Sequence, residues 1–272
     1  MDASSREALV LTRERLAERT AGAPGQLLLN LADELFAVSR LLDGQPSLRR
    51  ALSDAGVPPS DRASIARRLF AGKVSETAAD LVETLGRQRW SRPLDLVEAV
   101  QTLATEAALD GADARGELDN VEDELFRFGR IVGGDHELSR ILADRAAPAA
   151  GRTELIDRLV SQRVSPATAL LLRNVLTGSH VGNAENTIER LSEAASRRRG
   201  QSVAHVISAV VLTAAQERRL SEVLGRLYGR EIGLQVTVDP SVLGGLVVRV
   251  GDEVIDGSIA HRLEAAGRRL AG

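Results

Sequence analysis

Hydrophobic positions recur with helical spacing over most of the chain. Between residues 28 and 42 they fall at alternating steps of three and four, and the same spacing returns between residues 118 and 132. This spacing places one apolar stripe on one face of a helix. Similar stretches, separated by short turns, predict further helices at 46–53, 60–70, 93–109, 136–143, 152–160, 165–176 and 183–198. Most of the chain is therefore predicted to form bundles of short helices.

The helical pattern repeats at an offset of ninety residues. Residues 28–81 align without a gap on residues 118–171, and about twenty of the aligned positions are identical. Roughly five identities would be expected by chance from this composition. The sequence thus predicts a duplicated module, with copy 1 in residues 1–92 and copy 2 in residues 93–199. The helix over 93–109 is expected to serve both copies, because it lies where copy 2 needs its first helix.

Serine and proline mark the start of two of these helices. Ser75 and Ser165 are predicted N-caps, and Pro166 occupies a first helical position, where its missing N–H costs no hydrogen bond. The helix that follows Ser165 is almost continuously apolar up to residue 176. Such a helix must be buried in a core or against a partner.

The periodicity changes after the run Arg197–Gly200, which marks the predicted start of a C-terminal module over residues 200–272. Residues 202–213 are rich in Val and Ile on both faces, which predicts a buried strand. A helix is predicted over 214–228, and its apolar stripe contains Leu220, Val223, Leu224 and Leu227.

Three shorter strands and a last helix complete the predicted C-terminal module. Alternating apolar residues predict strands at 232–238, 246–250 and 253–255, with Gly251-Asp252 as a tight hairpin turn. Ser258 is the predicted N-cap of a helix that runs to residue 270. The predicted fold class is mainly α with a small α/β C-terminal module: two tandem helical bundles followed by a small mixed sheet with two helices.

Composition narrows the possible functions. The chain has a net charge of −3, no cysteine and 2% aromatic residues. Nucleic-acid binders are usually basic, and pockets for nucleotides or small molecules usually have aromatic walls, so no cofactor and no nucleic acid are expected. The absence of cysteine excludes disulfides and thiolate sites. Without a long apolar run or an apolar leader, the chain is expected to be cytoplasmic and not membrane-spanning.

Few residues of the sequence suggest a catalytic, metal-binding or phosphate-binding site. Gly244-Gly245 lacks the context of a phosphate-binding loop and is interpreted as a bulge or turn. The four histidines are scattered without metal-ligand spacing, and His205, in a predicted strand, is interpreted as a core or interface residue. Paired carboxylates can do acid–base work, but Asp252, Glu253 and Asp256 cluster at a turn, which explains Asp252 without catalysis.

Two further features leave alternatives open. Arg197, Arg198 and Arg199 could contact nucleic acid or anionic lipid, but arginines at a helix end also complement the helix dipole, which is the favoured interpretation. Trp90 lies between arginines, and it either anchors an interface or packs at the end of a helix.

The C-terminal module carries a recognisable set of motifs. They are Val238-Asp239-Pro240, Leu243-Gly244-Gly245, Val248-Arg249-Val250-Gly251-Asp252 and Asp256-Gly257-Ser258, all within residues 236–263. This combination resembles the C-terminal signature of the delta subunit of F-type ATP synthases, also called the oligomycin-sensitivity-conferring protein. Copy 2 is similar to the six-helix N-terminal domain of that family. The extra copy 1 departs from the usual pattern and resembles the longer delta subunits of actinobacteria.

The resemblance implies a mechanical function without catalysis. Family members are stator subunits of the peripheral stalk, on the cytoplasmic face of the membrane, and tie the catalytic alpha/beta head to the b subunits. Their helical domain takes the N-terminal helix of an alpha subunit into a groove, and their C-terminal module meets the b subunits. By analogy the groove is expected along residues 93–109 and 165–176, with candidate residues Val100, Leu103, Leu170, Leu171 and Val175. The signature residues that carry the resemblance are Asp239, Pro240, Gly244, Gly245, Arg249, Gly251, Asp252, Asp256 and Gly257.

Two other classes of function remain open at this stage. A helical regulatory adaptor with an unrelated α/β tail would explain the duplication but not the C-terminal motifs. An enzyme would need a catalytic set that the sequence does not offer.

Overall fold

The computed structural model describes residues 1–144, 148–160, 163–178, 183–201, 203–228, 232–239, 242, 244–250 and 253–256. The chain divides into two compact units, residues 1–193 and residues 194–272. The first unit is helical, and the second carries a sheet with its own hydrophobic core. The predicted fold class, mainly α with a small α/β C-terminal module, is confirmed.

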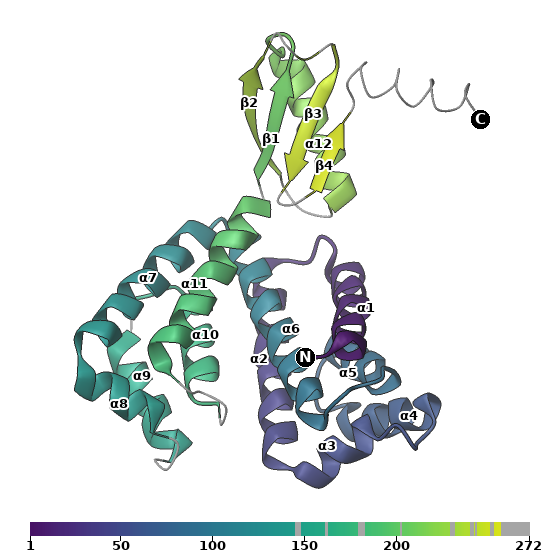
Figure 1. The fold of residues 1–272 in the computed structure, drawn as a ribbon, viewed down its shortest axis with the longest axis vertical. Helices are drawn as coiled ribbons and strands as arrows, with labels where there is room; N and C mark the ends of the chain where they lie inside the picture. Colours follow the sequence, from purple (N-terminus) through teal and green to yellow (C-terminus); the bar gives the residue numbers. More distant parts are fainter. Residues whose placement is uncertain are drawn as a thin grey trace. The chain divides into compact units, whose positions relative to one another are not determined.

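The helical part contains the elements α1 to α11 among the described residues (Figure 1). Helices α1 to α5 lie within residues 1–92, the predicted copy 1, and α6 to α11 begin within residues 93–199, the predicted copy 2. Their bounds are α1 Ala3–Thr20, α2 Gly25–Gly44, α3 Pro46–Ser53, α4 Pro59–Phe70, α5 Glu76–Arg87, α6 Pro93–Asp113, α7 Leu118–Gly134, α8 His136–Ala143, α9 Ala149–Val160, α10 Pro166–Leu176 and α11 Ala184–Gln201.

The offset of ninety residues reappears in the helix bounds. Helices α3 and α8 begin and end ninety residues apart, and so do α4 and α9. Helix α6 starts at Pro93, as predicted, but continues four residues past the expected end at 109. The division of the helical part at residues 92/93 stays a prediction, because α6 belongs to both copies.

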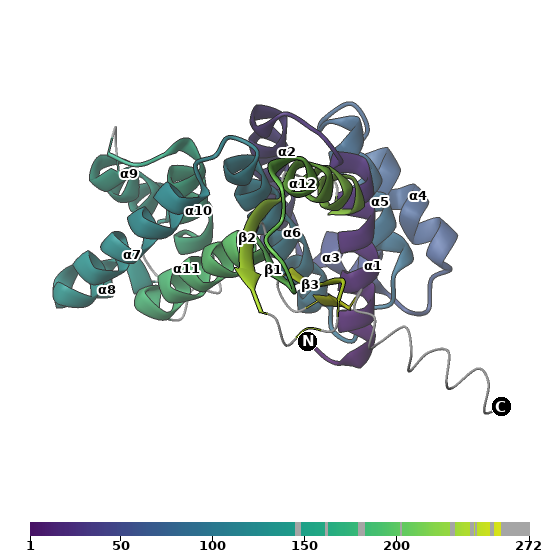
Figure 2. The same cartoon turned by 90° about the horizontal axis from the view of Figure 1, so that it is seen from above.

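Helix α6 is the shared element of the helical unit. It packs against α1, α2 and α3 of copy 1 and against α7 and α10 of copy 2. Its buried residues extend along most of the helix, from Asp95 to Ala112, while Leu94 and Glu98 are exposed. Helices α2 and α6 lie side by side and approach closely (Figures 1 and 2), since a Cβ atom built on Gly25 would lie 2.6 Å from the carbonyl oxygen of Gly111. Only glycine fits at this crossing.

The predicted N-caps Ser75 and Ser165 are confirmed. The Ser75 hydroxyl accepts a hydrogen bond from the Ala78 N–H at the start of α5, and Ser165 accepts one from the Thr168 N–H at the start of α10. Pro166 is the first residue of α10. Because each hydroxyl satisfies an N–H that has no partner inside its helix, both serines fix where the helix begins.

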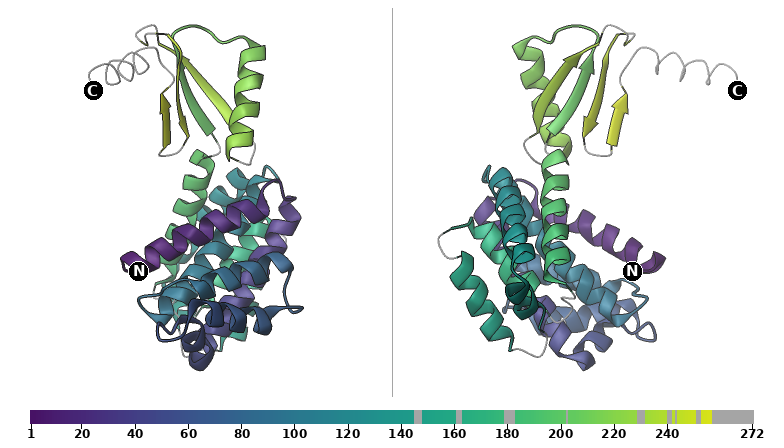
Figure 3. Two further views of the ribbon diagram at one scale, coloured as in Figure 1. Left: turned by 90° about the vertical axis from the view of Figure 1, so that its right-hand side faces the viewer. Right: turned by 60° about the vertical axis from the view of Figure 1, so that its left-hand side comes forward.

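The C-terminal unit is a four-stranded mixed sheet with the order β2-β1-β3-β4. The central strand β1 pairs in parallel with β2 and antiparallel with β3, and β3 pairs antiparallel with β4. Helix α12 lies over one face of the sheet (Figure 3) and contributes Leu224 to a core with Val206 and Val248. The bounds are β1 Val203–Ser208, α12 Ala214–Tyr228, β2 Gly233–Val238, β3 Leu246–Val250 and β4 Glu253–Asp256.

Two predictions for this unit are wrong in part. The first strand ends at Ser208 and not at 213, because Ser208 is the last residue that pairs with β2 and with β3. Val210 and Val211 beyond it are 66% and 77% exposed. Val223 and Leu227 of α12 are also exposed, because only the side of the helix with Leu224 meets the sheet. The predicted turn at Gly251-Asp252 and the predicted helix over 258–270 lie outside the described residues.

Candidate partner-binding surfaces

The C-terminal signature lies around the ends of the strands. The Asp239 N–H donates to the carbonyl oxygen of Ser208 at 2.8 Å, which holds the end of β2 against the end of β1. Gly244 and Gly245 have φ angles of 64° and 88°, directly before β3. Two consecutive left-handed residues favour glycine, so these two positions are explained by the turn into β3. This confirms the interpretation of Gly244-Gly245 as a backbone feature.

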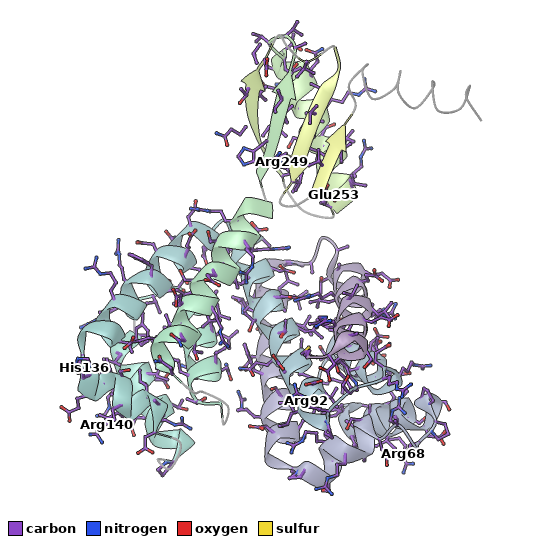
Figure 4. The ribbon with its side chains drawn as sticks, in the orientation of Figure 1. Arg68, Arg92, His136, Arg140, Arg249 and Glu253 are labelled. Carbon is purple, nitrogen blue, oxygen red and sulfur yellow. The ribbon has the colours of Figure 1, made fainter. Side chains whose placement is uncertain are left out.

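Three charged residues of the signature, Asp239, Arg249 and Asp256, lie within the described residues. Arg249 is exposed on β3, between the buried Val248 and Val250 (Figure 4). Glu253, the first residue of β4, accepts a 2.8 Å hydrogen bond from the Tyr228 hydroxyl, which ties the end of α12 to the edge strand. Asp256 is the last residue of β4. Pro240, Gly251, Asp252 and Gly257 lie outside the described residues.

The candidate groove residues are brought close together, but inside the core. Val100 and Leu103 of α6 and Leu171 of α10 are fully buried, and Val175 is 8% exposed. Leu170 is half-buried. Helices α6 and α10 pack against each other, and α2 packs against both. These side chains are thus covered by the chain itself among the described residues.

Trp90 and His205 have clear environments. Trp90 is 5% exposed and donates its Nε1–H to the carbonyl oxygen of Leu85 at 2.9 Å, so it packs at the end of α5. Of its two interpretations, packing at a helix end is the one observed. His205 is exposed on β1, so its assignment to the core is wrong, because its side chain lies on the face of the strand opposite to Val206.

The three arginines at 197–199 lie in the last part of α11, as the helix-dipole interpretation expects. Among the described residues no group of three His, Asp or Glu side chains is placed to hold a metal ion. Within the same residues, no helix has the length and apolarity needed to span a bilayer.

A glutamate contact, not predicted from the sequence, occurs in both copies. Glu34 on α2 accepts hydrogen bonds from the Ser75 N–H at 3.0 Å and from the Ser75 hydroxyl at 2.5 Å. Ninety residues later, Glu124 on α7 accepts from the Ser165 N–H and hydroxyl at 2.9 Å, and from the Thr168 hydroxyl at 2.6 Å. Both contacts link the second helix of a copy to the start of its fifth. The signal in the sequence was that the Glu and the Ser are both among the identical pairs.

A buried arginine is the second feature that sequence reasoning missed. Arg62 is 3% exposed and donates to five carbonyl oxygens. Three of them, on Gly86, Arg87 and Gln88, belong to the end of α5. Arg152, its counterpart in copy 2, is 5% exposed and donates to the Thr177 carbonyl at the end of α10. Each arginine satisfies carbonyl groups that a helix end leaves without partners.

Charged contacts fasten α1 to its neighbours in copy 1. Arg15 makes two hydrogen bonds of 2.7 and 2.8 Å to the Asp80 carboxylate on α5, and this hydrogen bonding lowers the pKa of Asp80. At the start of α6, burial of Asp95 would raise its pKa. Hydrogen bonds from Ser5 and Arg92 outweigh burial and lower it instead (Figure 4 labels Arg92). The helix α1 is therefore held by ionised carboxylates on two sides.

Comparison with known proteins decides the family. A family model described as the ATP synthase delta (OSCP) subunit matches residues 103–270. The chain belongs to the ATP synthase delta (OSCP) subunit family. It is 47% identical to ATP synthase subunit delta of Streptomyces coelicolor, over 100% of this chain and 98% of that protein. It is 45% identical to the subunit of Streptomyces griseus over the full length of both chains, and 44% identical to that of a Parafrankia species over 99% of both.

The full-length matches include copy 1, which the family model does not cover. The long architecture is thus shared with delta subunits of these bacteria. A chain from the mitochondrial ATP synthase hexamer of Toxoplasma gondii is similar over 62% of this chain, with 17% identity and a TM-score of 0.32, which is too low to carry an argument.

Proposed function

We propose that this delta-family chain is a non-catalytic stator subunit of the F-type proton-translocating ATP synthase. In this role it links the catalytic alpha/beta head to the b subunits of the peripheral stalk and resists rotor torque. The observation that carries the proposal is the full-length similarity to ATP synthase delta subunits, at 45% identity over the whole of both chains. The location that follows is peripheral, at the cytoplasmic face of the bacterial membrane.

The construction of the chain supports a mechanical role. Two buried charged groups of the described part serve the fold: the Arg62 guanidinium donates to carbonyl groups at a helix end, and the Asp95 carboxylate accepts hydrogen bonds from Ser5 and Arg92. A connector needs rigid modules and slowly dissociating apolar contacts more than reactive side chains. Two modules that hold two parts of one assembly also gain from effective concentration.

The partner of the helical unit is proposed to be an N-terminal helix of an alpha subunit, bound along α6 and α10. Because Val100, Leu103 and Leu171 are fully buried, a partner helix would reach them only if α2, which packs on both helices, moved away. The proposed binding site therefore lies near α6 and α10 and does not consist of those three buried side chains. The C-terminal unit is proposed to meet the b subunits.

The test is purification of the tagged chain from solubilised membranes of its own host, followed by mass spectrometry. Stoichiometric recovery of alpha, beta and b subunits is expected. A matched variant that begins at residue 93 would show what copy 1 adds to assembly. Recovery from the soluble fraction with other proteins, and without ATP synthase subunits, would contradict the stator function and favour a regulatory adaptor.

A further inference from the structure

One flank of α12 is apolar and exposed. Val223 and Leu227, four residues apart, are 43% and 62% exposed. At about 3.6 residues per turn, Leu227 lies about 60° to one side of the core residue Leu224, and Ser221 lies about 60° to the other side. Val223 lies on the same side as Leu227. The two exposed residues therefore form an apolar flank next to the side of α12 that meets the sheet.

Two polar contacts show which way this flank faces. The Ser221 hydroxyl donates to the carbonyl oxygen of Ile232 at 2.7 Å, and the Tyr228 hydroxyl donates to Glu253 at 2.8 Å. Ile232 directly precedes β2, and Glu253 is the first residue of β4. Strands β2 and β4 begin at the same end of the sheet, because β1 runs parallel to β2 and β3 runs antiparallel to both β1 and β4. Since Ser221 and Tyr228 lie on the same side of α12, the apolar flank faces the other end of the sheet.

At that other end of the sheet, Ile255 of β4 is also uncovered. It lies opposite Val248 in the register of β3 and β4, so both side chains point to the face that carries α12 (Figure 3). Val248 is 5% exposed, whereas Ile255 is 36% exposed. Val223, Leu227 and Ile255 thus border the same uncovered part of this face, the α12–β4 surface.

The sequence that directly follows β4 has the pattern that such a surface requires. Its apolar residues fall at steps of four, three and four, which places them on one stripe of a helix: Ile259, Leu263, Ala266 and Leu270. His261, Glu264 and Arg268 fall on the opposite side of the predicted helix. An amphipathic helix of this length gains most of its stability by packing its apolar stripe.

The connection to β4 favours this segment over a separate molecule as the occupant. Strand β4 ends at Asp256 and the predicted helix begins at Ser258, so Gly257 is the only residue between them. The helix must therefore start beside the end of β4 that carries Ile255. A helix over 258–270 spans about 20 Å, which is also about the length of a strand such as β1. A tethered segment has an effective concentration on the order of millimolar, which a separate partner would have to match.

We propose that residues 258–270 form a helix that packs on the α12–β4 surface of their own chain. Its apolar stripe lies against Val223 and Leu227, and its first turn lies against Ile255. The face of the sheet that α12 covers only in part thereby gains a second helix. The apolar flank of α12 is then closed to other subunits, which must contact this unit on a different surface. The inference does not depend on the proposed function.

The test is photo-cross-linking in the purified full-length chain, with p-benzoylphenylalanine in place of Leu263 in one variant and in place of Arg268 in another. Leu263 belongs to the apolar stripe, whereas Arg268 lies on the opposite side of the predicted helix. Mass spectrometry of the peptides should find position 263 linked to α12 or β4 and position 268 linked to neither. A mixture of ordinary and isotope-labelled chains separates links within one chain from links between two chains.

Several results of this experiment would overturn the proposal. They are links from position 263 only to the helical unit, only to a second copy of the chain, or to nothing, and equal links to α12 from both positions. In the assembled complex, a link from position 263 to another subunit in place of α12 and β4 would overturn it as well.

Hydrogen exchange gives an independent measurement that needs no bulky probe. Amides between residues 260 and 270 should be protected in the unchanged chain and should exchange about tenfold faster in Val223→Ser, because the stripe loses an apolar contact. Val211→Ser is the matched control, since Val211 is 77% exposed on the loop between β1 and α12 and should leave this exchange unchanged. Amides of α12 should stay protected in both variants. Unprotected amides in the unchanged chain, or equal exchange of the segment in both variants, would reject the inference.

Discussion

The two copies show which features of a duplicated sequence survive a change of surroundings. The contact between Glu34 and Ser75 in copy 1 is formed again by Glu124 and Ser165 in copy 2. Phe36 and Phe126, which lie ninety residues apart in matching stretches of sequence, are by contrast 2% and 58% exposed. Contacts within a copy repeat because both partners are duplicated with the sequence. Contacts between copies do not repeat, because only one junction exists.

The first helix of each copy gives the same lesson. Helices α1 and α6 are the first helices of the two copies, but α6 packs against helices of both copies, whereas α1 packs against α5 and α6. Where α6 carries buried small or apolar residues, α1 carries exposed glutamates. The equivalent pairs are Val97 and Glu7, Ala104 and Glu14, and Ala108 and Glu18.

The largest expected effect comes from the buried arginine of copy 1. Arg62→Met should lower the free energy of unfolding by about 3–5 kcal/mol, because several buried carbonyl groups lose their donor. Arg152→Met should cost less, since two of its guanidinium nitrogens, Nε and Nη1, have no partner in the described part of the chain. Urea unfolding followed by circular dichroism measures both.

Arg68→Met is the control for this pair, because Arg68 is an exposed arginine on the same helix as Arg62 (Figure 4). It should change stability by less than about 0.5 kcal/mol. Equal losses for Arg62→Met and Arg68→Met would show that the carbonyl contacts are not what stabilises this region.

The close approach of α2 and α6 is the next target. Gly25→Ala should destabilise the chain by about 1–3 kcal/mol, since the new Cβ would lie 2.6 Å from the Gly111 carbonyl oxygen and 2.5 Å from Arg115 Cγ. Gly44→Ala, where nothing lies within 4 Å, should be neutral or stabilising by up to about 1 kcal/mol. Thermal unfolding of the two variants separates tight packing from helix propensity. A stabilised Gly25→Ala variant would contradict the close crossing.

The buried carboxylate at the start of α6 should make stability depend on pH. The lowered pKa of folded Asp95 stabilises the chain at pH values above the unfolded pKa of about 3.9. This contribution is lost as the pH falls through the lower folded pKa, because the unfolded state takes up its proton first. Asp95→Asn should therefore lose about 2 kcal/mol near pH 7 and much less near pH 2.

Unfolding by urea at several pH values checks this prediction. Asp33 is exposed and has no polar partner in the described part of the chain, so Asp33→Asn should show a change within about 0.5 kcal/mol at every pH. A pH-independent difference between the unchanged chain and Asp95→Asn would mean that the pKa of Asp95 is the same in the folded and unfolded states, which would contradict the prediction.

The smallest expected effects come from the repeated glutamate contact. Glu124→Gln should cost about 1 kcal/mol and Glu34→Gln about half of that, because Glu124 accepts an additional hydrogen bond from Thr168 and its contact with Ser165 is partly buried, whereas that of Glu34 with Ser75 is exposed. Hydrogen exchange at the starts of α10 and α5 should rise in the corresponding variant only. A rise at both starts in either variant would show that the two copies unfold together.

Much of the fold could be predicted because it depends on local sequence. Apolar spacing predicts the limits of α3, α8 and β3. Residues that satisfy the N–H groups of a helix start predict the caps at Ser75 and Ser165. The end of β1 and the exposed side of α12 could not be predicted. A run of apolar residues looks the same in the sequence whether or not another element of the fold covers it. The signature motifs of the C-terminal unit could be found in the sequence. That Gly244 and Gly245 adopt left-handed backbone conformations was learned only from their φ angles in the structure.

The sequence by itself determined the family, the duplication and the identity of most helices, since these depend on residue order and on periods of three to four. Only the tertiary structure decided that Val100, Leu103 and Leu171 are covered by the chain, that Arg62 holds a helix end, and that Phe36 and Phe126 differ. The physical reason is that burial depends on which elements meet in space. Two segments of similar sequence then acquire different surfaces when their neighbours in space differ.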